Sequence, residues 1–221
     1  MSAMKELVVV GAGGLARETR WLLEEINEAG QARYKFSGYV VSDLSKLGDR
    51  DSRAEVLGDF DWLCTAERAK RIRAAVIGIG TPAARLRVAE ALLEKCPWLE
   101  WPALVHPTVR LDRSTCKVAR GVMLCAGTVA TVHVHFEEFA VVNLLCTIGH
   151  ESTIGRGSVL NPTVNVSGGV RIGEGALIGT GAQILQYLSV GDGATVGSGA
   201  VATRDVPAGT TVVGIPAKPL R

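Results

Sequence analysis

The chain has 221 residues, with 24 Lys and Arg against 22 Asp and Glu and a formal net charge of +2. This length can bury a sizeable core, and the charge balance lacks the basic excess expected of a partner of nucleic acids or anionic membranes. Five cysteines without metal-ligand spacing, no signal-peptide pattern and no apolar run of about 20 residues predict a soluble, cytoplasmic protein with reduced thiols.

The first hundred residues alternate strand-like and helix-like segments. Residues 6–10, with the sequence ELVVV, predict a buried strand, and leucines and isoleucine within residues 15–26 follow at helical spacing. Residues 36–41 and 74–80 predict further strands, and residues 82–95 predict an amphipathic helix. Strands that alternate with helices predict a small parallel sheet covered on both faces.

A glycine-rich turn, GAGGLARE, follows the first predicted strand. Gly11, Gly13 and Gly14 allow main-chain amides and a helix N-terminus to approach a ligand closely, which suits a phosphate. The spacing departs from GxGxxG because Ala16 takes the third glycine position, and Asp43 is the single nearby acid for a ribose. The turn predicts a site for the pyrophosphate of a nucleotide rather than for a nicotinamide cofactor. A plain strand-to-helix turn is the alternative.

From about residue 105 a six-residue period replaces this alternation. Every sixth residue is apolar in the series Val118, Leu124, Ala130, Phe136, Val142, Ile148, Ile154, Leu160, Val166, Ile172, Ile178, Ile184, Val190, Val196 and Ala202. A helix of 3.6 residues per turn cannot keep this period on one face, whereas a triangular coil with six-residue sides can. Such coils stack about 4.8 Å apart through parallel hydrogen bonding. The pattern predicts a left-handed parallel β-helix over residues 105–221, after an α/β domain over residues 1–104.

Short motifs along the whole chain carry a resemblance to a known family. They are VVVGAGGLARE, GYVVSDLSK, IGIG, VHPTV, VVNLLCTIGHE, SGGVRIGEGALIG and GIPAK. Their order resembles the sialic acid O-acetyltransferase family, which includes bacterial N-acetyltransferases acting on nucleotide-linked amino sugars. The resemblance implies a Rossmann-like nucleotide-sugar domain and a β-helix that uses acetyl-CoA, in a homotrimer with active sites between subunits.

The same resemblance implies roles for individual residues and no metal. His150 would be the general base, Glu151 its acidic neighbour and Asn143 a residue near the acceptor. Three positions are implied for acetyl-CoA, namely Gly168, Thr180 and Lys218. Five positions are implied for the nucleotide-sugar, namely Gly11, Gly13, Gly14, Leu15 and Asp43.

Acyl transfer chemistry asks for these parts independently. An amine that attacks a thioester must lose a proton, and an imidazole, whose ordinary pKa is about 6.5, can take it. The carboxylate of Glu151 would hold the ring of His150, and the main-chain amide of Gly168 would stabilise the tetrahedral intermediate. His150 and Gly168 are eighteen residues apart. One coil of the predicted β-helix would therefore stack them along one cleft.

Other readings of these residues stay open. His150 and Glu151 could be surface residues of a solvated turn. His133 and His135 compete as bases or zinc ligands, but they alternate along a predicted strand and lack a recognisable ligand spacing with His150. The remaining histidine, His106, is predicted to lie at the entry to the β-helix.

The sequence therefore predicts an acetyl-CoA-dependent N-acetyltransferase for the amine of a nucleotide-linked sugar. Transfer to a hydroxyl of a sugar such as sialic acid needs the same parts and is one alternative. A non-catalytic trimer that binds nucleotide-sugar is another, since Gly149 and Val159 stand where many family members have an acid and a second histidine. A nicotinamide-dependent oxidoreductase is a third, although no hydride-transfer site is recognisable.

Overall fold

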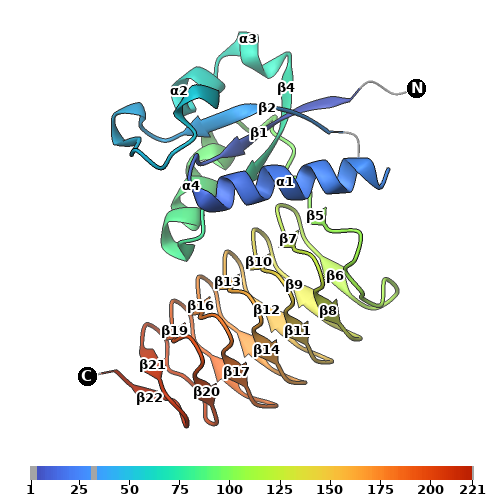
Figure 1. Cartoon of the computed structure of the whole chain (residues 1–221), viewed down its shortest axis with the longest axis vertical. Coiled ribbons are helices and arrows are strands. Elements are labelled where there is room, and N and C mark those ends of the chain that lie inside the picture. The colour runs from blue at the N-terminus through green and yellow to red at the C-terminus, as the bar shows by residue number, and fades with distance from the viewer. Residues whose placement is uncertain (1–3, 31–33, 221) are drawn as a thin grey trace. The chain divides into compact units, whose positions relative to one another are not determined.

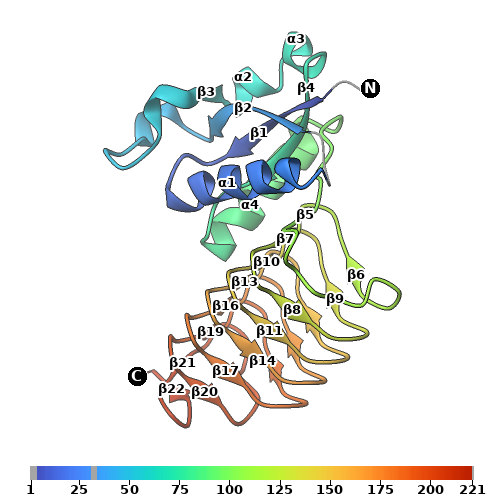
Figure 2. The same ribbon diagram turned by 45° about the vertical axis from the view of Figure 1, so that its right-hand side comes forward.

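The computed structural model describes residues 4–30 and 34–220, and it divides into two compact units. One unit holds the described residues up to Gly80 together with Ala84–Pro102. The other holds Thr81–Ala83 and the described residues from Ala103 onward. The α/β elements belong to the first unit and the short stacked strands to the second (Figures 1 and 2).

The first unit is built on a four-stranded parallel sheet in the order β3-β2-β1-β4. Its strands are β1 (Lys5–Val10), β2 (Tyr34–Val41), β3 (Val56–Asp59) and β4 (Ile72–Ile77). Its α-helices are α1 (Gly14–Glu28), α2 (Phe60–Leu63), α3 (Ala66–Ala69) and α4 (Pro82–Lys95), with 3₁₀ turns at Leu44–Lys46 and Arg53–Glu55. The four apolar residues that end β1 are all buried, so both faces of the sheet are covered, as the run ELVVV predicts.

The predicted elements of this unit are largely confirmed. Predicted strands at residues 6–10, 36–41 and 74–80 correspond to β1, β2 and β4, although β4 ends at Ile77, before the predicted limit. The predicted helix at residues 82–95 is α4. The sequence pattern does not predict β3, α2 or α3, because four-residue elements are too short to show a period.

The cysteines are only partly as predicted. Cys64 and Cys96 form a disulfide, so the expectation of reduced thiols is wrong for this pair. The bond joins the residue after α2 to the residue after α4. The odd number of cysteines and their spacing in the sequence do not show that these two residues lie close together. Among the described residues, Cys116, Cys125 and Cys146 take part in no disulfide. Burial raises the pKa of the Cys146 thiol to about 11, which keeps it protonated near neutral pH.

The second unit contains three parallel sheets of very short strands. The β10 sheet comprises β5 (Leu104–Val105), β7 (Met123–Leu124), β10 (Val141–Val142), β13 (Val159–Leu160), β16 (Leu177–Ile178), β19 (Thr195–Val196), β21 (Thr211–Val213) and the antiparallel β22 (Lys218–Pro219). The β11 sheet comprises β8 (Val129–Ala130), β11 (Thr147–Ile148), β14 (Asn165–Val166), β17 (Gln183–Ile184) and β20 (Val201–Ala202). The β12 sheet comprises β6 (Lys117–Val118), β9 (His135–Phe136), β12 (Thr153–Ile154), β15 (Arg171–Ile172) and β18 (Ser189–Val190).

The chain visits the three sheets in rotation, which confirms the predicted β-helix. Thr147 pairs with Asn165 and Ile148 with Val166, so each residue lies beside the one eighteen positions later. The same separation relates β10 to β13 and β12 to β15. Eighteen residues therefore complete one coil.

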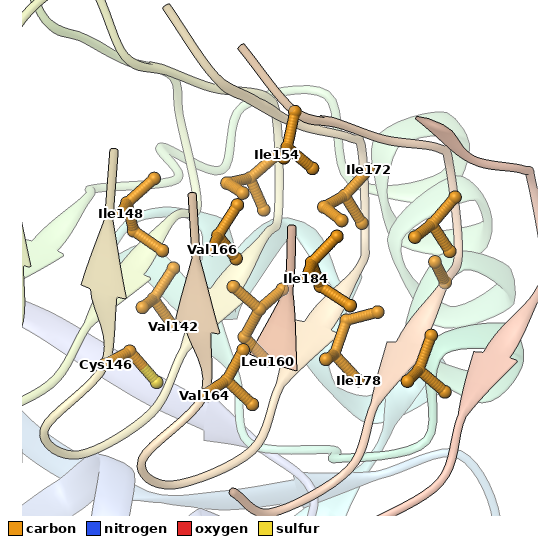
Figure 3. Packing of buried hydrophobic residues seen from close by; sticks show 14 of the residues in the cluster. Val142, Cys146, Ile148, Ile154, Leu160, Val164, Val166, Ile172, Ile178 and Ile184 are labelled. Carbon is orange, nitrogen blue, oxygen red and sulfur yellow. The ribbon is translucent and has the colours of Figure 1, made fainter. Parts of the chain in front are cut away.

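The core of this unit combines the inward members of the six-residue series with residues two positions before them, such as Val164, Ala176 and Ala182. Figure 3 labels Val142, Leu160 and Ile178 from one column, Ile148, Val166 and Ile184 from a second, and Ile154 and Ile172 from the third. All eight side chains are at most 3% exposed. Burial of each stabilises the fold by roughly 1.5–3 kcal/mol. The hydroxyl of Ser152 also lies inside, where it donates to Ser167 O at 3.0 Å and accepts from Val170 N at 3.3 Å.

Within residues 4–30 and 34–220, the structure contains no helix that is both long enough and apolar enough to cross a bilayer.

Ile172 and Arg171 test the inward column. Ile172 is buried and Arg171, its neighbour in β15, is exposed. We expect Ile172→Ala to lower the free energy of unfolding by about 2–5 kcal/mol because it leaves a cavity, and Arg171→Ala to change it by no more than about 0.5 kcal/mol. Urea unfolding followed by circular dichroism measures both values. Equal losses for the two variants would contradict the assignment of Ile172 to the core.

Candidate active site

The candidate site lies where the chain leaves the β11 sheet and enters the β12 sheet. We call this the β11–β12 corner and define it as residues 131–134, 149–152, 167–170 and 185–188. Hydrogen bonds join its coils, since Gly169 N donates to His150 O at 2.7 Å and Tyr187 N donates to Gly168 O at 2.9 Å. His150 and Gly168 thus occupy the same position of successive coils.

The imidazole of His150 packs directly against Gly168. A Cβ atom on Gly168 would overlap Nε2, Cε1 and Cδ2 of the ring, so this close approach requires glycine. A Cβ atom on Gly149 would lie 2.5 Å from Gly168 N, so glycine at position 149 lets the backbones of these two coils pack closely. Within the described part of the chain, the Gly168 N–H donates no hydrogen bond. A base and an unused amide donor therefore lie side by side.

Glu151 lies beside the other nitrogen of the imidazole. Its Oε2 lies 3.4 Å from Nδ1 of His150, and the two side chains are 63% and 51% exposed. A side-chain contact this exposed contributes at most about 1 kcal/mol to stability. Glu151 also has a φ of +58°, a left-handed conformation that costs a non-glycine residue about 1–2 kcal/mol. The pair therefore adds little to the stability of the fold.

The other β-helix residues that the resemblance implies lie elsewhere. Asn143 and Thr180 lie where the chain passes from the β10 sheet to the β11 sheet, which we call the β10–β11 corner. The side chain of Asn143 accepts from Leu144 N at 2.8 Å. Lys218 is exposed in the last strand, β22. A single chain thus brings together His150, Glu151 and Gly168, and it separates them from Asn143, Thr180 and Lys218.

The other histidines and Val159 have different surroundings. His133 lies one coil before Glu151 at the β11–β12 corner, and His135 lies in β9. His106 is buried, with Nδ1 2.8 Å from Thr108 Oγ1. Across residues 4–30 and 34–220, no group of three His, Cys, Asp or Glu side chains could hold a metal ion. Val159 is buried in β13, away from the β11–β12 corner. The absence of a histidine at position 159 therefore leaves the surroundings of His150 in the same chain unchanged.

A second candidate site lies in the first unit, at the carboxyl ends of β1 and β2. Gly11 and Asp43 line a hollow of about 160 Å³ there. Gly11 has a φ of +110°, which favours glycine, and its N–H donates to Val40 O at 2.8 Å. The pKa of Asp43 is lowered, so its carboxylate stays ionised. The largest cause is a hydrogen bond from the side chain of Ser45, followed by one from the Ser45 main chain and by Lys46. The hollow thus offers a charged acceptor.

Three other predicted nucleotide residues do not line this hollow. Gly13 is the N-cap residue of α1, Gly14 begins the helix, and Leu15 follows within its first turn. Asp51 does line it, and its Oδ1 would lie 3.5 Å from a Cβ atom on Gly13. A carboxylate therefore already lies near the helix N-terminus, where the sequence predicts a pyrophosphate.

Lys46 and Asp51 also line the hollow, and sequence reasoning missed both. Lys46 belongs to a 3₁₀ turn, and Asp51 lies in the following loop, where its Oδ2 accepts from Gly48 N at 2.8 Å. Ser52 N donates to Ala12 O at 2.9 Å, which holds this loop against the glycine turn. Gly48 and the aspartates around it signal a turn in the sequence. Nothing local shows that the turn folds back onto residue 12.

Solved structures resemble the chain over its whole length, although no protein-family model and no curated protein matches it. The acetyltransferase domain of PglB from Neisseria gonorrhoeae is 28% identical, with 98% of this chain and 100% of that chain covered and a TM-score of 0.81. WeeI from Acinetobacter baumannii is 26% identical, with 99% and 100% covered and a TM-score of 0.78. PerB from Caulobacter crescentus, solved with CoA and GDP-perosamine, is 24% identical, with 99% of each chain covered and a TM-score of 0.83.

These similarities and the coil geometry define the class of protein. The chain is a hexapeptide-repeat acetyltransferase with a left-handed β-helix. Because the matches extend over both units, they also confirm the resemblance to the sialic acid O-acetyltransferase family that the motifs predict.

Gly168→Ala tests whether the glycine positions the imidazole. The atoms that an added Cβ would overlap belong to the His150 side chain, which can rotate away, so we expect a melting temperature close to that of the unchanged protein. The displaced ring should lower kcat by about 100-fold. Steady-state kinetics and thermal unfolding measure the two effects, with Glu174→Ala at another corner as the control. Retention of full activity would show that the contact is incidental.

Proposed function

We propose that the protein transfers the acetyl group of acetyl-CoA to the amine of a nucleotide-linked amino sugar. The observation that carries this proposal is the contact between the His150 imidazole and Gly168, whose amide N–H is unused in the described part of the chain. The comparisons support the substrates. The PglB domain has been solved with acetyl coenzyme A, and PerB with CoA and GDP-perosamine.

The proposed mechanism uses the two faces of the imidazole. Glu151 lies beside Nδ1, so Nε2, on the Gly168 side, takes a proton from the attacking amine. The nitrogen–carbon bond forms, and the thioester oxygen becomes an oxyanion that accepts a hydrogen bond from Gly168 N–H. When the carbon–sulfur bond breaks, the thiolate of CoA receives the proton from His150, and the amide product remains.

The remaining contacts require more than one copy of the chain in this proposal. Asn143 and Thr180 lie at the β10–β11 corner, at the far end of the β11 sheet from His150. We therefore propose a homotrimer in which neighbouring subunits face each other across the site. Thr180 would bind acetyl-CoA through its main-chain amide, and the exposed ammonium of Lys218 suits a phosphate of the coenzyme.

The hollow beside Gly11 is the proposed site for the nucleoside part of the acceptor. The ionised carboxylate of Asp43 can accept hydrogen bonds from ribose hydroxyls. The nearby carboxylate of Asp51 favours hydrogen-bond donors over phosphate oxygens in this hollow. We place the protein in the cytoplasm, where acetyl-CoA and nucleotide sugars are made.

A panel of UDP-, GDP- and dTDP-linked amino sugars with acetyl-CoA tests the proposal. Thiol release should occur with at least one acceptor, and His150→Ala should lower kcat by about 10²- to 10⁴-fold because the base is lost. His135→Ala, which removes a different histidine, should keep activity. Product analysis separates an amide from the ester that sugar O-acetylation would give. If wild-type turnover never exceeds that of His150→Ala, the proposal fails.

Asp43→Ala tests the nucleotide site separately. Loss of a charged acceptor should weaken binding of the nucleotide-sugar by at least about tenfold and leave binding of acetyl-CoA unchanged. Isothermal titration calorimetry with each ligand measures this. Asp49→Ala, in the same loop but outside the hollow, is the matched control. Equal nucleotide affinity for the two variants would remove Asp43 from the site.

A further inference from the structure

Tyr187 is an exposed aromatic residue at the β11–β12 corner that the proposed mechanism does not use. Its side chain is 70% exposed, and its φ of +60° is left-handed. Bulky residues rarely adopt this conformation. Burial of the ring within the chain therefore does not explain why tyrosine stands at this position.

The ring of Tyr187 lies beside the His150–Gly168 contact. A Cβ atom on Gly169 would overlap Cδ1 and Cε1 of Tyr187, just as one on Gly168 would overlap the imidazole. His150 belongs to the coil before the two glycines and Tyr187 to the coil after them. The imidazole of His150 therefore packs on Gly168 from the preceding coil, and the ring of Tyr187 packs on Gly169 from the following coil.

The packing of a ring or branched side chain on glycine is a general feature of this coil. Phe139 lies against Gly121 in the same way and is fully buried, and Leu145 lies against Gly127. The packing of Tyr187 thus belongs to the fold. Its distinctive features are the exposure of the ring and its place next to the base and the unused amide.

The spacing of the two glycines limits what can bind there. Consecutive Cα atoms are about 3.8 Å apart, so the Gly168 amide is adjacent to the glycine that the ring of Tyr187 covers. In the proposed function, that group is the thioester oxygen of acetyl-CoA. The acyl carbon chain or the sulfur attached to the same carbonyl carbon can then reach the ring of Tyr187.

We propose that Tyr187 contacts the acyl-thioester end of the coenzyme and limits the length of the acyl group that is transferred. The inference rests on the proposed function, because it takes the Gly168 amide as the donor to the thioester. The ring fills the space beside Gly169 that a longer acyl chain would need. Its apolar face packs against the thioester and the first carbons of the pantetheine arm.

Tyr187→Gly and Tyr187→Phe test this contact. Glycine suits the left-handed backbone, so Tyr187→Gly removes the ring without adding strain. We expect it to weaken acetyl-CoA binding about tenfold and to raise the ratio of kcat/KM for butyryl-CoA over acetyl-CoA at least about tenfold. Tyr187→Phe keeps the ring and should stay within about twofold of the unchanged protein for both.

Glu174→Ala is the control, because Glu174 is exposed where the chain passes from the β12 sheet to the β10 sheet, a corner that holds none of the proposed coenzyme contacts. It should leave the acyl preference unchanged. Calorimetry with acetyl-CoA and butyryl-CoA needs no acceptor, so it separates two failures. Suppose that the unchanged protein binds acetyl-CoA and that Tyr187→Gly binds each coenzyme as tightly as the unchanged protein does. The role of Tyr187 is then refuted, while the proposed function stands. If the unchanged protein binds no acetyl-CoA, the proposed function itself fails.

Light scattering on the same samples addresses a purely structural role for Tyr187. We expect Tyr187→Gly to keep the assembly state of the unchanged protein. Dissociation of the assembly, accompanied by loss of coenzyme binding, would assign Tyr187 to a subunit contact and overturn the inference.

Discussion

Parallel hydrogen bonding between coils is the constraint on which the second unit depends. Each bond fixes a residue beside the one eighteen positions later, as when Gly149 N donates to Val166 O at 2.8 Å and Gly169 N donates to His150 O at 2.7 Å. The inward columns follow from this register, because every third side of the coil repeats the same orientation. The candidate site follows from it too, since Gly168 reaches the imidazole of His150 only through exact stacking of their corners.

The two units differ in how much of their structure is visible in the sequence. In the β-helix, the period in the sequence is the period of the structure, so the fold and the stacking of His150 on Gly168 could be predicted. In the first unit, β1 and α4 have clear apolar patterns, whereas β3, α2 and α3 are too short to show one. The Cys64–Cys96 bond and the place of Asp51 depend on contacts between distant segments, and no local pattern encodes these.

The candidate site is only partly contained in one chain. Geometry groups His150, Glu151 and Gly168, while Asn143 and Thr180 lie at the other end of the β11 sheet. A triangular coil has this property in general, because residues six positions apart occupy different corners. Sequence resemblance gives each residue a role but cannot show which of them meet within a chain. That distinction required the arrangement of the three sheets.

The eighteen-residue coil also determines how the chain can tolerate changes in length. Insertion or loss of a whole coil would return every later residue to its own corner and shift it along the stack by about 4.8 Å. A change of six residues would instead rotate all later residues to the next corner, while their aliphatic side chains still faced inward. A change of six residues would therefore leave the packing of the hydrophobic core intact. The corner on which the coenzyme-binding residues lie, relative to the corner that holds the base, is therefore constrained by function and not by packing of the core.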